Sequence, residues 1–294
     1  MCGIVGLYLK KKSLHDKLGF YLSGMLINMS SRGPDSAGFA IYNNETKNFK
    51  FSISIPKDFQ FKNFEKKIKN EFNDVKIKVI SDHLVVTTPT LPKNFISYLK
   101  NNFNEVNLIG YGKSIEVYKQ VGNPKKIVEN FNLNNFSGSH AIGHTRMATE
   151  SAITLDGSHP YSTGQDECLV HNGSLSNHNN LRRNLLKKGI KFDSLNDTEV
   201  AAGYITSELS NNKSIKKALT NCLRDLDGFY TFIAGTIKGF AVLRDEIACK
   251  PAVIAENDDY VAIASEFQAI AHLPKINQAK IYEPDPGVVY TWGK

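Results

Sequence analysis

Apolar, strand-like segments open and close this sequence, and helical segments lie between them. The chain begins with CGIVGLYL, and the segments FYTFIAG, GFAVLRD, PAVIAEN and DYVAIAS follow one another between residues 229 and 265. Long apolar runs of this kind are typical of buried strands. Two packed sheets covered by helices bury such strands most simply. We therefore predict a single α+β domain over residues 2–294.

Helical periodicity and capping signals place the helices. Leucine and methionine recur at helical spacing after Ser13, which begins a capping-box pattern with Asp16, so we expect a helix over residues 14–30. Further helices are expected over residues 177–188, 197–210 and 214–226. GFAIY and FKFSISI are expected as strands joined by a turn at Asn43 and Asn44.

Residues 57–137 differ in character from the rest of the chain. KDFQFKNFEKKIKNEF predicts an exposed helix, VKIKVISDHLVVTT a strand and PKNFISYLKNNF a second helix. IEVYKQVG then predicts a strand, and a helix is expected to begin at Pro124. The region contains no dense polar motif.

Composition excludes several classes of protein. The net charge of +7 comes from lysines spread along the chain, so nucleic acid is not an expected partner. The apolar start is too short to span a membrane and lacks the basic stretch of a signal peptide, so a cytoplasmic protein is expected. The cysteines lack zinc-site spacing, so no metal is expected, and Cys222 and Cys249 are predicted to be buried thiols.

Cys2 stands one residue from the start of the chain and is followed by Gly3. A thiolate is the reactive form of cysteine, and an ordinary thiol with a pKa near ~8.5 is mostly protonated at pH 7. If Met1 is removed, Cys2 gains a free α-amino group, whose pKa of about 7.7 to 8.0 suits it to accept the thiol proton. Cys2 is thus a candidate nucleophile, and the alternative is a small buried residue at a strand start.

Polar motifs elsewhere in the chain favour the nucleophile. SSRGPDSAGFAIY, GHTRMATES, GSHPY, LVHNGSLSNH and NDTEV occur in this order. With the amino-terminal cysteine, these motifs resemble those of the class II glutamine amidotransferases. The resemblance implies a four-layer αββα sandwich, the N-terminal-nucleophile (Ntn) hydrolase fold. It also implies hydrolysis of the side-chain amide of glutamine and delivery of the ammonia to a synthase site.

The resemblance assigns catalytic roles to three residues. Cys2 matches the family nucleophile, and the Asn172 side chain and Gly173 N–H, in VHNG, match the oxyanion hole. Such donors typically contribute about 10²- to 10³-fold each to the rate. Asn172 and Gly173 also suit a simple hairpin turn.

The resemblance assigns substrate contacts to four further residues. Arg146 in HTRMAT and Asp197 in NDTEV match the residues that hold the carboxylate and the ammonium of the amino acid, a pairing that suits both charges. Thr149 matches a further substrate contact, and Arg32 matches an arginine close to the nucleophile. Arg146 and Asp197 also suit a structural ion pair, and Asp197 alone suits a helix N-terminus.

The partner expected from the resemblance is a separate protein. The sequence ends near Trp292 without a synthase-like segment, so the released amine needs an acceptor elsewhere, and the 57–137 elaboration is a candidate docking surface. MCGIVGLYLK, GKSIEVYKQVG and GHTRMATES are most similar to the amidotransferase subunits of split glutamate-synthase-like complexes, including those of the N-methylglutamate synthase type.

That likeness implies a substrate and cofactors. The substrate is glutamine or a γ-glutamyl amide such as γ-glutamylmethylamide, and the partner synthase subunit carries FMN and an iron–sulfur cluster. No cofactor is expected in this chain. Two alternatives stay open at this point, a stand-alone Ntn amidohydrolase or acylase and a catalytically silent amino-acid-binding scaffold subunit.

Overall fold

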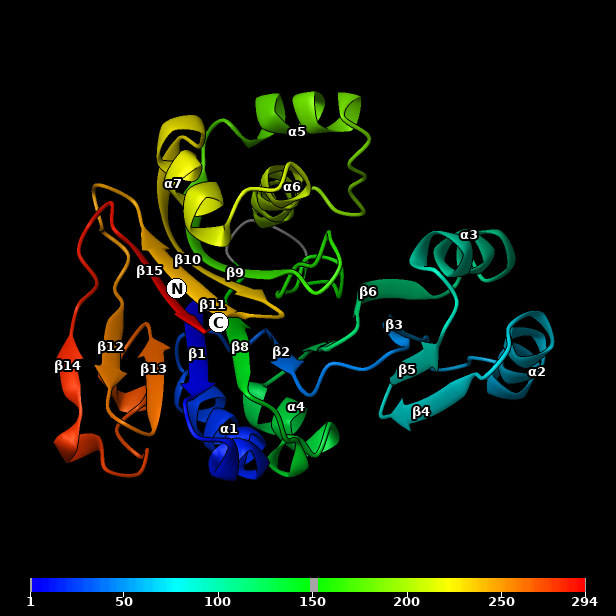
Figure 1. Ribbon diagram of the computed structural model, residues 1–294, viewed down its shortest axis with the longest axis horizontal. Helices are drawn as coiled ribbons and strands as arrows, with labels where there is room; N and C mark the ends of the chain where they lie inside the picture. The colour runs from blue at the N-terminus through cyan, green and yellow to red at the C-terminus, as the bar shows by residue number, and fades with distance from the viewer. Residues whose placement is uncertain (1, 149–152, 294) are drawn as a thin grey trace.

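Two sheets stacked face to face form the centre of the protein in the computed structural model, which describes residues 2–148 and 153–293 (Figure 1). The larger sheet has the strand order β14-β12-β13-β1-β8-β2-β7. Its strands are β1 (Gly3–Leu9), β2 (Ser36–Tyr42), β7 (Ile115–Val121), β8 (His140–Arg146), β12 (Val253–Glu256), β13 (Tyr260–Ala264) and β14 (Lys280–Tyr282). Each pairing in this sheet is antiparallel.

The smaller sheet has the order β15-β11-β10-β9 and packs on the first through apolar side chains of both sheets. Ile4 and Ile142 of the larger sheet lie in this layer with Val170 and Ile233 of the smaller one, all fully buried. The strands of the smaller sheet are β9 (Cys168–Leu175), β10 (Gly228–Thr236), β11 (Gly239–Arg244) and β15 (Val289–Gly293).

Helices cover both outer faces. Leu22 and Leu26 of α1 pack on Val5 and Leu7, which point out of the opposite face of β1. On the other side, Val200 and Leu219 pack on Phe232 of β10. The helices are α1 (Leu18–Asn28) and α4 (Pro124–Asn130) on the larger sheet, α6 (Asp197–Ser210) and α7 (Ile215–Asp225) on the smaller, and α5 (His178–Lys187), which packs on α6. The predicted α+β sandwich with αββα layers is confirmed.

A third sheet with its own core projects from the edge of the sandwich (Figure 1). We call residues 49–112 the accessory lobe. Phe51, Phe64 and Phe95 are fully buried between its sheet and its helices. Its sheet, ordered β4-β5-β3-β6, contains β3 (Phe49–Ser54), β4 (Lys76–Ile80), β5 (His83–Thr88) and β6 (Asn107–Gly112), and its helices are α2 (Phe61–Glu71) and α3 (Pro92–Asn102).

The observed lobe differs from the predicted 57–137 elaboration at both ends. β3 precedes residue 57 yet pairs with β5 and β6, so it belongs to the lobe. β7 and α4 fall within 57–137 but pair with β2 and pack on the larger sheet. The physical reason is that strand pairing, not the density of polar motifs, decides which core a segment joins.

Four local predictions are corrected. Residues 75–88 form two paired strands, because Ser81 takes a left-handed conformation (φ +54°) and turns the chain back. β2 and β3 lie in different sheets, so no hairpin forms at Asn43 and Asn44. Residues 12–17 form a 3-10 helix before α1, and neither helix has a side-chain cap. Cys222 is buried as predicted, but Cys249 is exposed in the loop after β11.

Within the described ranges, each helix is too short or too polar to cross a membrane.

Candidate functional site

The amino-terminal end of β1 meets the carboxyl end of β8. Gly3 pairs with Thr145 across the sheet. A side chain at position 3 would place its Cβ 2.8 Å from the Thr145 hydroxyl oxygen and 3.1 Å from Cβ of Met29. Glycine therefore allows the chain to enter the sheet directly beside β8, with Cys2 immediately outside it.

Cys2 is half-buried and is held through its backbone. Arg32 donates from Nε to the Cys2 carbonyl oxygen at 3.0 Å, and its Nη1 forms an ion pair with Glu266. The Cys2 Sγ lies 4.0 Å from the carbonyl oxygen of Met147, so the thiol faces the segment that leaves β8. The structure thus brings Arg32 and Cys2 together, and Arg32 bonds directly to the backbone of Cys2.

The RGPD segment packs against the end of β8 and shapes the chain that carries Arg146. A Cβ at Gly33 would lie 2.3 Å from the Thr145 carbonyl carbon. Asp35 donates its N–H to the Arg146 carbonyl oxygen at 3.1 Å, and its carboxylate accepts from Ala148 N–H at 2.8 Å. Arg146 is only 5% exposed. Glycine and aspartate in this motif therefore fix the backbone on both sides of the arginine.

Asn172 and Gly173 lie near the carboxyl end of β9. The Asn172 side chain is buried, and its Nδ2 has no hydrogen-bond partner among the described residues. Gly173 has a φ of +153°, and a Cβ there would lie 2.0 Å from the Phe229 carbonyl oxygen. A buried amide donor without an acceptor is costly, which makes this atom available to a ligand oxygen.

Asp197 is the first residue of α6, and its carboxylate lies against the end of β9. Asn196 caps the helix by accepting from Thr198 N–H at 2.8 Å. Asp197 Oδ2 accepts from Leu175 N–H at 2.8 Å, and the Asp197 side chain is 22% exposed. The carboxylate is therefore tied to the strand that carries Asn172 while staying accessible.

Three buried histidines, none of them an expected site residue, join these elements. His144 donates from Nε2 to the carbonyl oxygen of His171 at 3.1 Å and stacks on His159 with ring centroids 3.8 Å apart. His159 Nε2 and His171 Nδ1 each lie 2.8 Å from the Thr198 hydroxyl oxygen, which donates to Asp197 at 3.4 Å. The signal available in the sequence was one histidine in each of three motifs, GHTR, GSHPY and VHNG.

The hydrogen-bond pattern determines which ring nitrogens of this cluster carry protons. A hydroxyl donates once, so with Thr198 donating to Asp197 both histidine nitrogens donate to its oxygen. The remaining nitrogens, His144 Nδ1, His159 Nδ1 and His171 Nε2, are bare acceptors without partners among the described residues. Burial lowers the pKa of His144 to about 3 and of His171 to about 4, and lowers the pKa of His159 well below its usual range. All three rings are therefore neutral at pH 7.

The predicted residues thus gather where the two sheets end together. Cys2, Arg32 and Arg146 belong to the larger sheet and its loops, whereas Asn172 and Asp197 belong to the smaller sheet and α6. The hydrogen bond from His144 to His171 joins the two groups. Thr149 lies outside the described residues. No group of three or more side chains suited to a metal ion occurs in residues 2–148 or 153–293.

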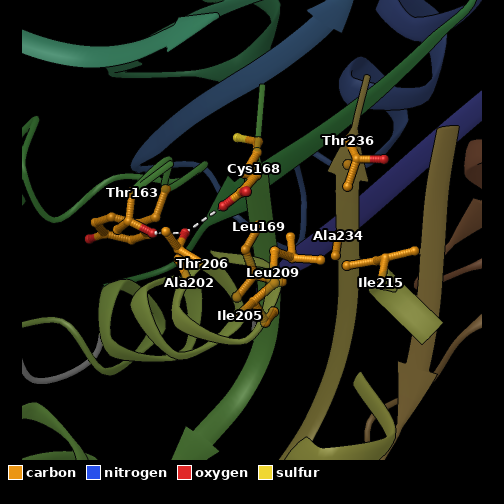
Figure 2. Close-up of a pocket in the computed structure, with 13 residues that line it drawn as sticks. Thr163, Cys168, Leu169, Ala202, Ile205, Thr206, Leu209, Ile215, Ala234 and Thr236 are labelled. Carbon is orange, nitrogen blue, oxygen red and sulfur yellow. Dashed lines mark hydrogen bonds between the residues drawn. The ribbon is translucent and has the colours of Figure 1, made fainter. Parts of the chain in front are cut away.

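A small cavity lies at the other end of β9 (Figure 2). It holds about 10 Å³, room for one water molecule. Thr163 and Thr206 stand at its polar side, their hydroxyl oxygens 2.6 Å apart, and Cys168 marks the start of the strand. Its size and position separate it from the ends of the strands where Cys2 and Asn172 lie.

Comparison with known proteins identifies the family. A model described as a glutamine amidotransferase domain matches residues 144–272. Over 99% of its length the chain is 51% identical to the glutamine amidotransferase-like protein GlxB of Rhizobium meliloti, and the match covers 98% of that protein. The chain belongs to the class II glutamine amidotransferases. The amidotransferase is also 30% identical to a putative glutamine amidotransferase of Methanothermobacter thermautotrophicus, with 99% of each protein covered.

Solved structures share the amidotransferase's fold. Glutamine phosphoribosylpyrophosphate amidotransferase from B. subtilis matches 99% of the chain with a TM-score of 0.64 at 20% identity, and the match covers 47% of that structure. An allosteric regulatory enzyme of purine biosynthesis matches with a TM-score of 0.66 at 21% identity. The amidotransferase thus spans about half the length of these solved chains.

Proposed function

We propose that this amidotransferase hydrolyses the side-chain amide of glutamine, or of a γ-glutamyl amide such as γ-glutamylmethylamide, through a thioester on Cys2. The thiolate attacks the amide carbon, and the C–N bond breaks as the amine leaves with a proton. Water then hydrolyses the thioester to release glutamate. Once Met1 is removed, the α-amino group of Cys2 takes the thiol proton and returns it to the leaving amine.

The observation that carries this proposal is the unpartnered amide nitrogen of Asn172. Negative charge develops on the substrate oxygen when the thiolate attacks, and a fixed, buried donor stabilises that charge most strongly. Asn172 Nδ2 is such a donor, and the neighbouring Gly173 N–H is the second proposed donor. The two lie one and two residues beyond His171, which is joined to the strand next to Cys2.

Arg146 and Asp197 suit the two charged groups of the substrate amino acid. A buried guanidinium binds a carboxylate through two parallel hydrogen bonds, and an accessible carboxylate binds an ammonium. Arg146 is 5% exposed at the end of β8, while the Asp197 side chain is 22% exposed at the start of α6. Thr149 completes the proposed substrate contacts, and Arg32 holds the Cys2 carbonyl while the thiol reacts.

The amine released here requires an acceptor, because ammonia or methylamine is otherwise lost to water. We propose a separate synthase subunit of the glutamate synthase or N-methylglutamate synthase type, with FMN and an iron–sulfur cluster in that subunit and none in this chain. The similarity of MCGIVGLYLK, GKSIEVYKQVG and GHTRMATES to subunits of such complexes supports this partner. We propose a cytoplasmic location for the complex.

Covalent labelling tests the nucleophile. The protein is incubated with 6-diazo-5-oxo-norleucine, and its intact mass is measured. We expect a single adduct on a chain that lacks Met1, and none on Cys2→Ala. An active preparation that retains Met1 overturns the proposed mechanism.

Kinetics with two substrates test specificity. Glutamine and γ-glutamylmethylamide are compared by kcat/KM, with and without the partner subunit. Arg146→Ala should lower kcat/KM at least about a hundredfold, because an unpaired substrate carboxylate loses a charge-assisted bond pair. Unchanged amide hydrolysis in Arg146→Ala indicates a stand-alone acylase, and absence of any thioester with intact Cys2 indicates a silent scaffold.

A further inference from the structure

A cleft of about 800 Å³ separates the accessory lobe from the helical layer of the sandwich. One wall is formed by α3 and β6 of the lobe, and the facing wall by residues 160–163 and by the segment that joins α5 to α6. Figure 1 shows α3 turned toward α5 and α6 across this side of the molecule. The volume lies in the range of sites that enclose a small organic molecule.

A buried lysine forms the floor of the cleft. Lys119, on β7, is 5% exposed and lines the cleft. Its Nζ donates to the Ser158 carbonyl oxygen at 3.0 Å and lies 4.9 Å from the centre of the Tyr161 ring. An ammonium has three N–H groups, so these contacts leave donor capacity within the described residues. Burial lowers the pKa of Lys119 to about 8, which leaves the amine mostly charged at pH 7.

The other buried charged group on the cleft wall, Glu199, already has its hydrogen bonds satisfied by neighbouring N–H and O–H groups. The Glu199 carboxylate accepts from the Asp193 and Ser194 N–H groups at 2.8 Å each and from the Ser194 hydroxyl at 2.7 Å. A carboxylate satisfied in this way has little need of the lysine. The charge at the floor that remains without a carboxylate partner in the described residues is therefore the Lys119 ammonium.

The exposed rim of the cleft is balanced in charge. Lys100 of α3 faces Asp193 at 4.0 Å, and the exposed Lys191 and Asp156 lie at the same rim. Two positive and two negative groups produce no strong net field, so a ligand with several negative charges gains little there. A ligand with a single negative group that reaches Lys119 at the floor gains the most binding free energy.

The lobe contributes the apolar surface of the cleft. These side chains come from α3, from the segment after it and from β6, and they are Ile96, Leu99, Phe103, Val106, Leu108 and Ile109. Apolar contact area of this kind binds the body of a ligand, while one placed charge sets its orientation.

We propose that this cleft binds a small organic carboxylate with an apolar body. The carboxylate pairs with the Lys119 ammonium at the floor, and the body packs against α3 and β6. The site is distinct from the proposed active site because it uses none of the residues assigned to amide hydrolysis, and it does not depend on that function.

The cleft shares a wall with the proposed active site. Tyr161 lines the cleft and meets the His159 ring edge to face at 5.0 Å between centroids. His159 in turn bonds Thr198, the neighbour of Asp197. A ligand bound to Lys119 therefore contacts Tyr161, which is linked through His159 and Thr198 to Asp197 of the proposed ammonium subsite.

Calorimetric titration tests the proposal. Phenylacetate is titrated into the full-length Cys2→Ala protein at pH 7, with the neutral isostere phenylacetamide as the comparison ligand. We expect saturable binding of phenylacetate in the millimolar range or tighter, and at least tenfold weaker binding of phenylacetamide. Equal affinity for the two ligands, or no saturable binding of phenylacetate, overturns the proposal.

Matched variants locate the binding site. Lys119→Met keeps the length of the side chain and should weaken phenylacetate binding at least tenfold, whereas Lys100→Met at the rim should change it less than twofold. Arg146→Ala should also have little effect on phenylacetate binding. If Arg146→Ala abolished that binding, phenylacetate would occupy the proposed substrate site instead. If circular dichroism shows that Lys119→Met does not fold, the comparison of phenylacetate with phenylacetamide on the protein that retains Lys119 still tests the proposal.

Discussion

His144 Nε2 lies 3.1 Å from the carbonyl oxygen of His171, and this hydrogen bond joins the end of β8 in one sheet to the end of β9 in the other. Each strand continues directly into a proposed functional residue, Arg146 two positions after the first histidine and Asn172 one position after the second. The separation of the two sheets at this end therefore sets the distance between the proposed carboxylate-binding and oxyanion-binding groups.

Replacing Thr198 tests the histidine cluster. Thr198→Val keeps the shape of the side chain but removes the oxygen that accepts from His159 and His171. Two buried donors then lose their acceptor, and we expect the free energy of unfolding to fall by about 1–3 kcal/mol, with a lower kcat/KM for glutamine. Urea unfolding and steady-state kinetics measure both. Thr220→Val on the exposed face of α7 is the matched control, with an expected change within about 0.5 kcal/mol.

Gly173 and Gly122 form a matched pair for testing the site backbone. Both have positive φ, but a Cβ at Gly173 would collide with the Phe229 carbonyl oxygen, whereas Gly122 has nothing within 4 Å. Gly122→Ala should cost about 1–2 kcal/mol through backbone strain alone. Gly173→Ala adds the collision and should cost clearly more, with loss of activity. Equal costs in urea unfolding would show that the strand relaxes around the new methyl group.

The buried histidines predict that acid destabilises the fold. Burial lowers the folded-state pKa values of His171 and His140 to about 4, against about 6.5 for an unfolded histidine. The unfolded chain therefore binds more protons between these values, and the free energy of unfolding falls as the pH is lowered from 7 toward 4. We expect a loss of roughly 1–2 kcal/mol per buried ring between pH 7 and pH 5.

Urea unfolding at a series of pH values measures this dependence. His140→Gln should reduce the slope of stability against pH, because one buried ring no longer titrates, whereas exposed His272→Gln is the control. A stability that is flat between pH 7 and pH 5 would contradict the neutral, buried state of these rings.

The ion pair between Arg32 and Glu266 predicts a kinetic effect without unfolding. Glu266→Gln removes the charge that holds the guanidinium against the Cys2 carbonyl. We expect kcat to fall about tenfold while the free energy of unfolding changes by no more than about 1 kcal/mol, since the Glu266 side chain is 36% exposed. Glu283→Gln, which faces Arg244 at an exposed position, is the control. An unchanged kcat would limit Arg32 to a structural role.

Sequence reasoning succeeds where one local signal decides the structure. The helix expected over residues 197–210 is observed as Asp197–Ser210, because Asn196 caps it and an apolar face follows. Strands β14 and β15 were not predicted, since both are half-exposed edge strands whose pairing depends on distant residues. The apolar neighbours of Cys249 suggested burial, yet the thiol is exposed, and Ala248 before it has a left-handed backbone conformation (φ +53°).

Predicting the candidate site from motifs has a similar limit. The motifs singled out Cys2, Asn172 and Asp197, and the structure gathers these residues at one end of the sandwich. The histidine cluster escaped prediction because the hydrogen bonds made by its three imidazole rings join residues 27 to 39 positions apart, and no spacing rule connects them. Glu266 gave no signal, because a single exposed glutamate is ordinary until its partner is known.

The accessory lobe begins after β2 and ends before β7, and these two strands are direct neighbours in the larger sheet. Tyr42, the last residue of β2, pairs with Ile115, the first of β7. In topological terms the whole lobe occupies the position of a hairpin loop. A chain in which a short turn replaces residues 44–113 would keep every strand connection of the sandwich. The lobe, and with it the cleft that has Lys119 at its floor, is therefore an insertion that leaves the topology of the Ntn fold unchanged.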